Sequence, residues 1–428
     1  MRIENFLHRV GKLRRTFNYY YKLPVLLFPL IAVTHADATE LSLLKAIEMT
    51  LENNPSLHFY RLRQEQLQGL TSVERLSPGL ELGIELENVA GNGDFSGTDQ
   101  AEITLALSSV IELGGKLESR QSAANARLQK SEFQRKAKTL DVLADVTRHF
   151  IGLMATQEQF VIANESAQLS SSMLKTLNER MQRGAVSEAE VMRAKALVTQ
   201  AKIQRDNLQR KYERQKVQLV RFWGQTDVDF STVTGDLYAF GKEQEFAALY
   251  DKVKQSPSLQ VYASDLRLKD AEVRLAKTQS QADLTWQIGV RRFEETGDSA
   301  LTLGVSMPLF SKSRNSGAIK AAQAARNSVE FESEERLLEL HERLFTAYSQ
   351  RQQFISAHEL LKDAVIPDLE KALGITEQAY ERGRLGYQDW IMAQQELLDA
   401  KRQMIETATA ELLNQAVIEQ LTAQPLTQ

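Results

Sequence analysis

The chain has 428 residues and a formal net charge of −4, with eight prolines and no cysteine. The lack of cysteine excludes disulfides, thiolate catalysis, thiolate metal sites and a cysteine-linked lipid anchor, while the acidic balance disfavours nucleic acid as a partner. Few prolines and 7% aromatic residues favour long helices over a thick globular core.

Residues 1–38 are predicted to be a secretory signal peptide. A basic stretch precedes an apolar run over 23–33, and Ala36-Asp37-Ala38 matches a small-residue cleavage site. The run is too short for a membrane-spanning helix, which needs about 20 apolar residues, although a retained anchor is the alternative. Cleavage would make the mature chain more acidic, because the segment holds more basic than acidic residues.

In the remaining chain the same motifs occur twice in the same order, which predicts two repeats over 39–235 and 236–428. Each copy starts with an Asn/Ser-Pro-Ser-Leu motif, at 54–57 and at 256–259. Two short strands, a long helix, a glycine turn and a returning helix follow in each copy. The duplication therefore predicts a fold made of two similar halves.

Four segments alternate between apolar and polar residues and are predicted to be strands. They cover 80–89 and 101–110 in the first repeat and 284–293 and 300–309 in the second. A period of two places the apolar side chains on one face. A half-buried sheet in a soluble domain gives the same alternation. The export signal, and the lack of further strands to cover the apolar faces, favour transmembrane strands.

Each strand pair is predicted to be a hairpin, with loops at 91–97 and 294–298. Four strands cannot close a barrel, and open edges in lipid cost several kcal/mol for each unsatisfied backbone group, so the barrel must be shared between chains. Its polar face would carry acids that an arginine partly offsets: Glu81, Glu85, Glu87, Glu102 and Arg291. These charges favour cations in the lumen, or are ordinary solvated charges of a barrel lining.

Two long helical hairpins are predicted from apolar residues at coiled-coil spacing. The first runs out over 115–183 and back over 187–222, and the second over 316–382 and 387–421. At 1.5 Å per residue, about 68 helical residues span on the order of 100 Å, which no compact domain needs. Pro367 is expected to kink or break the second outgoing helix.

The sequence shows no pattern typical of an enzyme or of a fixed metal site. The histidines after residue 38 are scattered, without the spacing of zinc or copper ligands: His58, His149, His341 and His358. No glycine-rich phosphate loop follows a strand, and the paired acids on the strands lack a nucleophile or base beside them. No catalytic residue, cofactor or metal ligand is predicted.

Together these features resemble the outer membrane efflux protein family of the TolC type, over nearly the whole chain from Leu41. The resemblance rests on the duplicated Pro-Ser-Leu motifs, the hairpin positions and the two Arg-Gly turns, in this order. The stretches 85–88 and 107–116 are similar to the heavy-metal branch of that family, the CzcC-like proteins. The family fold is mainly α-helical: homotrimers form a twelve-stranded β-barrel in the outer membrane and a long coiled-coil barrel in the periplasm.

The resemblance implies the passive exit duct of a tripartite pump of the RND type. Its partners would be a periplasmic adaptor, an inner-membrane transporter and outer membrane lipid, and its cargo metal cations. Organic drugs or secreted polypeptides are the alternative cargo. A soluble periplasmic coiled-coil scaffold is the alternative class of protein.

The family docks its adaptor at the turns of the long hairpins, which fall here on two groups of residues. These are Arg183, Gly184, Ala185, Val186 and Ser187, and Arg382, Gly383, Arg384, Leu385, Gly386 and Tyr387. The family also narrows its tunnel with aspartates, one of which is matched by Asp389, with Glu190 in the equivalent place of the first repeat; a further one falls on Met392. Alternatively, both acids only stabilise the start of a helix, by about 0.3–1 kcal/mol.

Overall fold

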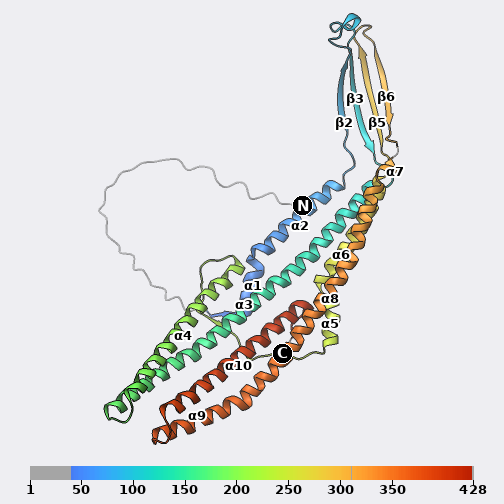
Figure 1. Ribbon diagram of the computed structural model, residues 1–428. Coiled ribbons are helices and arrows are strands. Elements are labelled where there is room, and N and C mark those ends of the chain that lie inside the picture. The colour runs from blue at the N-terminus through green and yellow to red at the C-terminus, as the bar shows by residue number, and fades with distance from the viewer. Residues whose placement is uncertain (1–39, 310, 427–428) are drawn as a thin grey trace, which may run out of the picture. The chain divides into compact units, whose positions relative to one another are not determined.

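The structure is a computed structural model that describes residues 40–309 and 311–426. The predicted signal peptide lies outside these residues. Within them, helices that run alongside one another make up most of the chain, and the four longest strands form one sheet (Figure 1). None of the described helices combines the length and the apolar character needed to cross a membrane.

The first repeat opens with three short elements: β1 (Glu40–Ser42), α1 (Leu43–Asn53) and α2 (Pro55–Glu74). Asn54 separates the two helices, and its side-chain oxygen accepts hydrogen bonds from the N–H groups of Ser56 and Leu57, at 2.9 and 3.3 Å. Pro55 occupies the first helical position, where a missing N–H costs nothing. The Asn-Pro-Ser-Leu motif is therefore a helix start, and its second copy begins α6 (Pro257–Gln279).

The first long hairpin consists of α3 (Lys116–Gln182) and the returning α4 (Glu188–Val220), which pack along each other. Gly152 does not interrupt α3. Its carbonyl accepts hydrogen bonds from the hydroxyl of Thr156, at 2.9 Å, and from the side-chain amide of Gln215 on α4, at 3.4 Å. The predicted pair of long helices is confirmed.

The second hairpin contains four consecutive elements: α8 (Ser316–Leu360), the π-helical turn η3 (Leu361–Val365), α9 (Ile366–Glu381) and α10 (Tyr387–Thr422). The kink or break expected at Pro367 corresponds to an interruption of the α-helix: α8 ends at Leu360 and α9 begins at Ile366, but the π turn η3 keeps the chain helical between them. A π turn holds one extra residue, which accommodates the missing N–H of the proline and the clash of its ring with the preceding turn.

Four strands form one antiparallel sheet in the order β2-β3-β5-β6. They are β2 (Glu81–Glu87), β3 (Glu102–Ile111), β5 (Leu284–Phe293) and β6 (Ser299–Ser306). The predicted strands are confirmed with shifted ends. β2 stops before Asn88 and Ala90, whose φ angles are both 59°, and β6 stops before Pro308, which has no N–H for the ladder. β2 and β6 remain open edges of the sheet.

The largest hydrophobic core lies where α1, α3, α4 and α10 meet the segment that joins the two repeats. Phe150, Leu153 and Leu219 are among its fully buried side chains. In this segment β4 (Thr232–Thr234) pairs in parallel with β1, so the two ends of the first repeat lie side by side. The sequence did not predict this strand pair, nor α5 (Phe246–Lys254). The boundary between the repeats at 235/236 remains a prediction.

A buried ion pair joins α8 to α10. The Nε atom of Arg351 lies 2.7 Å from Oε1 of Glu411, and the two side chains are 4% and 0% exposed. The guanidinium of Arg351 also donates to the carbonyl of Gly241 in the joining segment. Burial raises the pKa of Glu411 to about 7, against the attraction of Arg351, which lowers it. This charged pair thus links α8, α10 and the segment that joins the two repeats.

Candidate functional site

The apolar face of the sheet is uncovered in the single chain. The strand register aligns apolar residues in rows across all four strands, one of which is Leu82, Leu107, Ile288 and Leu303. Within this row Ile288 is 42% and Leu303 75% exposed. An apolar surface of this kind, which no described residue covers, suits contact with lipid.

The polar face is more enclosed than the apolar face. Thr104 is only 2% exposed, whereas its neighbour Leu105, on the other face, is 49% exposed. One row across this face contains only small residues: Gly83, Ala106, Gly289 and Thr302. A Cβ added to Gly289 would lie 2.7 Å from the carbonyl oxygen of Leu105, so no larger residue fits. The closer packing of the polar face is what the inner, concave face of a closed barrel wall would show.

The predicted lumen charges lie on this polar face, and the arginine binds two of the acids directly. The guanidinium of Arg291 is 2.7 Å from the carboxylate of Glu87 and 2.8 Å from that of Glu102. Within the described part of the chain, Glu81 and Glu85 have no ion pair. One arginine cannot neutralise two carboxylates, so the polar face keeps net negative charge at the Arg291 cluster as well as at the unpaired Glu81 and Glu85.

The two predicted docking tips share one backbone geometry. Gly184 and Gly383 have φ angles of 74° and 70°. The N–H of the following residue donates to the carbonyl five residues earlier, at 2.9 Å in both tips: Ala185 to Arg180, and Arg384 to Ala379. This helix ending needs a left-handed residue, which explains the repeated glycine. Most tip side chains are exposed, as a docking surface requires.

Tyr387 differs from the other predicted docking residues because it is buried, at 4% exposure. It belongs to a hydrophobic cluster that joins the two tips and includes Leu177, Val191 and Tyr380. Burial, with the nearby Tyr380 and Glu190, raises the pKa of Tyr387 to about 12. Tyr387 therefore holds the two hairpins together and offers little surface to a partner.

Further aromatic and cationic side chains complete the contact between the tips. The ring of Tyr380 stacks on that of Trp390, with 5.0 Å between centroids, and the guanidinium of Arg180 lies 4.5 Å from the centre of the Tyr380 ring. Sequence reasoning missed Tyr380 and Trp390. The signal was the clustering of aromatic residues on both sides of the second turn.

Both gate candidates hold the start of a helix. The carboxylate of Glu190 accepts from the N–H of Ser187 at 3.0 Å, and the Ser187 hydroxyl accepts from the N–H of Glu190 at 3.3 Å. Asp389 accepts from the N–H of Gly386 at 2.9 Å, and glycine has no side chain to return a bond. Each acid thus has a structural role, and its role in a constriction remains a prediction.

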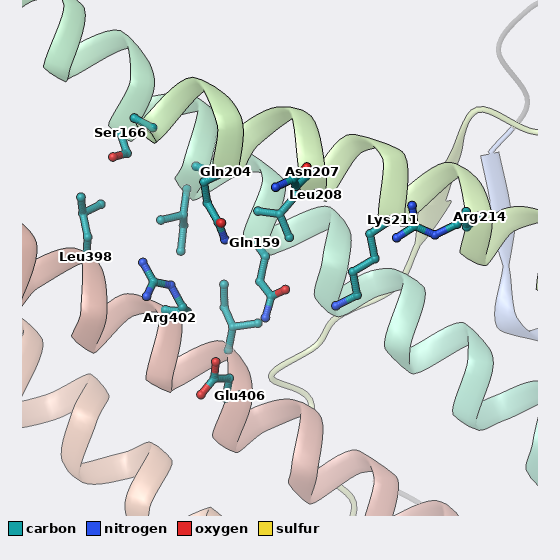
Figure 2. A pocket seen from close by; sticks show the side chains of 14 residues that line it. Gln159, Ser166, Gln204, Asn207, Leu208, Lys211, Arg214, Leu398, Arg402 and Glu406 are labelled. Atoms are coloured by element: carbon teal, nitrogen blue, oxygen red, sulfur yellow. The ribbon is translucent and has the colours of Figure 1, made fainter. Parts of the chain in front are cut away.

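A groove runs between the returning helices α4 and α10, with α3 at its base. Its enclosed part has a volume of about 490 Å³, and Figure 2 shows Lys211 and Arg214 of α4 across it from Arg402 and Glu406 of α10. Amide side chains such as Gln159 and Gln204 make up much of the remaining polar lining. Cations therefore outnumber acids in the groove. Sequence reasoning missed it because its walls are almost 200 residues apart.

No group of three or more His, Asp or Glu side chains within 40–309 and 311–426 is arranged to hold a metal ion. Three of the scattered histidines contact aromatic rings instead: His149 lies against Phe222, His341 against Tyr250 and His358 against Tyr238, with ring centroids 5.0, 4.8 and 5.4 Å apart. These contacts fit packing roles.

The family model of the outer membrane efflux proteins matches residues 46–225 and 248–424. The chain belongs to the outer membrane efflux protein family. As a member it is an outer membrane channel of a tripartite efflux system, with its helical tunnel in the periplasm. The predictions of family and location are confirmed, and the alternative of a soluble scaffold falls away.

Named relatives and a solved structure agree with this assignment. The cobalt-zinc-cadmium resistance protein CzcC of Cupriavidus metallidurans is 23% identical over 364 residues, 85% of each chain. The pyoverdine export outer membrane protein OpmQ of Pseudomonas putida is 23% identical over 363 residues, 77% of this chain and 71% of OpmQ. The CmeC outer membrane channel of Campylobacter jejuni superposes with a TM-score of 0.75, at 16% identity, over 89% of this chain and 85% of CmeC. The predicted TolC-like fold is confirmed.

Proposed function

We propose that this efflux channel is the exit duct for metal cations. The observation that carries the proposal is the similarity to CzcC, which extends over 85% of both chains. The acids on the polar face of the sheet support it, because negative charge in a lumen favours cations, and Glu81 and Glu85 have no ion-pair partner among the described residues. OpmQ, named for pyoverdine export, matches a smaller share of the chain.

Deletion of the gene in its host tests the cargo. We expect lower tolerance to cobalt, zinc and cadmium, restored by the wild-type gene, with unchanged tolerance to organic drugs. A Glu81→Gln/Glu85→Gln variant, which removes the unpaired lumen charges, should restore metal tolerance only in part. Sensitivity to drugs without sensitivity to metals would assign the channel to the alternative cargo.

Three copies are proposed to close the barrel. The open edge β2 would pair with β6 of the next chain, since each edge strand must satisfy its backbone groups in lipid. The helices next to these edge strands in the chain also carry exposed apolar stripes: Phe59, Leu62, Leu70 and Val73 on α2, and Phe331, Leu338 and Phe345 on α8. The mass of the purified complex in detergent should correspond to a trimer, and a monomer would reject the closure.

The exposed tips are proposed to dock a periplasmic adaptor that links the duct to an RND-type inner-membrane transporter. A photoreactive amino acid in place of Leu385, which is exposed at the second tip, should cross-link to an adaptor in living cells. The matched control is Val161, an exposed apolar residue in the middle of α3. Equal cross-linking from both positions would contradict docking at the tips.

Asp389 is proposed to narrow the tunnel as a ring of three carboxylates. Asp389→Asn keeps an oxygen that can accept from the N–H of Gly386 but removes the charge. In planar bilayers we expect higher conductance and block by divalent cations weakened by roughly tenfold. Glu188→Gln is the control, because it removes an exposed acid from the first turn of α4 that is not a gate candidate. Unchanged conductance and block in the Asp389 variant would leave the acid with its helix-capping role alone.

A further inference from the structure

The charge of the chain is uneven where the second hairpin leaves the sheet. Residues 299–329 contain no Asp or Glu, while the same stretch holds four cations: Lys312, Arg314, Lys320 and Arg326. In a chain with a formal net charge of −4, an acid-free stretch of this length gives one end of the sheet a local positive charge.

The positive stretch begins where the lipid-facing surface ends. The apolar residues of the last strand and its extension are exposed on one face as far as Leu309. The short helix α7 (Ser311–Arg314) and the first turns of α8 follow directly. The hairpin loops lie at the other end of the strands, and the helices of this family lie in the periplasm. Arg314 and Lys320 are therefore at the level of the headgroups of the periplasmic leaflet.

Equivalent cations of the first hairpin are neutralised within the chain. Lys116 lies 2.7 Å from Asp283, and Arg120 pairs with Glu112 and with Glu74. These ion pairs fix the strand ends to α3. The junction of the first hairpin therefore presents little free positive charge to the membrane.

In the second junction, Arg326 is the first cation with acidic partners. It pairs with Asp270 at 3.2 Å and with Glu330 at 2.6 Å. Before that point, Arg314 and Lys320 are exposed, and neither makes an ion pair with a described residue. Two exposed cations beside an apolar band, without acids of their own, are complementary to a negatively charged membrane surface.

We infer that Arg314 and Lys320 bind the phosphate groups of anionic phospholipids in the periplasmic leaflet of the outer membrane. The chain has no cysteine that could carry a lipid anchor, so its own surface must supply its contacts with the membrane. Each chain contributes its own pair of cations. The inference therefore depends on the membrane location of the family and not on the proposed cargo.

The test uses the purified full-length protein in an uncharged detergent, titrated with phosphatidylglycerol or with phosphatidylcholine and followed by native mass spectrometry. The wild type should bind phosphatidylglycerol more tightly. Removal of one cation, in Arg314→Gln or Lys320→Gln, should weaken phosphatidylglycerol binding by about fivefold. The double variant should lose this factor twice. Binding of phosphatidylcholine should not change, and the preference should decrease with added salt.

Two control variants distinguish lipid binding at Arg314 and Lys320 from a general effect of positive charge. Lys195→Gln/Lys202→Gln removes two cations from α4 and should leave the lipid preference unchanged, and Arg314→Lys/Lys320→Arg should retain it. Equal binding of the two lipids by the wild type, or full preference in the double glutamine variant, would overturn the inference. Competition by inorganic phosphate at the lipid concentration would instead identify a site for free anions and would also overturn it.

Discussion

Replacing Ile288 with lysine is expected to abolish the detergent-resistant assembly in the outer membrane. Ile288 lies mid-strand in β5, in the apolar row with Leu107 and Leu303. A lysine on the lipid face near the bilayer midplane costs about 2–4 kcal/mol, and three chains would bear this cost in one barrel. The measurement is the amount of heat-modifiable complex in purified outer membranes.

Gln287→Lys is the matched control, because it adds the same charge one residue away on the polar face. We expect this variant to assemble at nearly the wild-type level, since its side chain reaches the water-filled side of the sheet. If the two variants assembled equally well, the proposed direction of the two faces would be wrong. If only Gln287→Lys failed to assemble, the faces would be reversed.

Arg351→Met is expected to destabilise the protein by about 3–5 kcal/mol at pH 8, because it leaves the carboxylate of Glu411 buried without its partner. The loss of stability is measured from thermal or denaturant unfolding of the helical part. Arg336→Met is the control: it lies on the same helix in an exposed pair with Glu339, and surface pairs contribute at most about 1 kcal/mol. Similar losses in both variants would contradict the importance of the buried pair.

The effect of Arg351→Met should shrink at low pH. Burial raises the folded-state pKa of Glu411 to about 7, above its ordinary value of 4.5, so the folded protein keeps a proton that the unfolded chain releases between these values. In the wild type this linkage therefore lowers the stability as the pH rises from 4.5 to 7, and no further above pH 7. Without Arg351 the pKa of Glu411 rises further, because an attraction that lowers it is lost, so the variant continues to lose stability above pH 7 and its difference from the wild type grows there. A loss of stability equal at pH 5 and pH 8 would contradict this account.

The features that the sequence predicted correctly are set by neighbouring residues. Alternation within ten residues is enough to define β5 at 284–293, and a Pro-Ser-Leu motif is enough to start α2 and α6. The glycines of the two tips follow from local backbone geometry in the same way. Since the chain repeats these local patterns, their order also pointed to the family.

The features that the sequence did not predict depend on residues far apart in the chain. Nothing near Glu411 indicates that Arg351 will meet it, and the parallel pairing of β1 with β4 joins segments almost 200 residues apart. At Pro367 the local rule predicts a kink or break, and the α-helix is interrupted there, but the rule does not show that a π turn keeps the chain helical. Tyr387 was assigned to the docking surface because the sequence could not show its burial, which depends on contact with the other hairpin.

The row of small residues across the polar face has a consequence for ions in a closed barrel. Glu81 and Glu85 lie on either side of this row on β2, two residues from Gly83 in each direction, or about 7 Å along the strand. The carboxylate of Glu81 therefore forms one negative level. Glu85, which shares its row with Arg291, forms a second together with Glu87 and Glu102, and a neutral level lined by backbone and small side chains lies between the two. A hydrated cation would cross the membrane in two weakly held steps, and repulsion from a second cation at the neighbouring level would speed its exit.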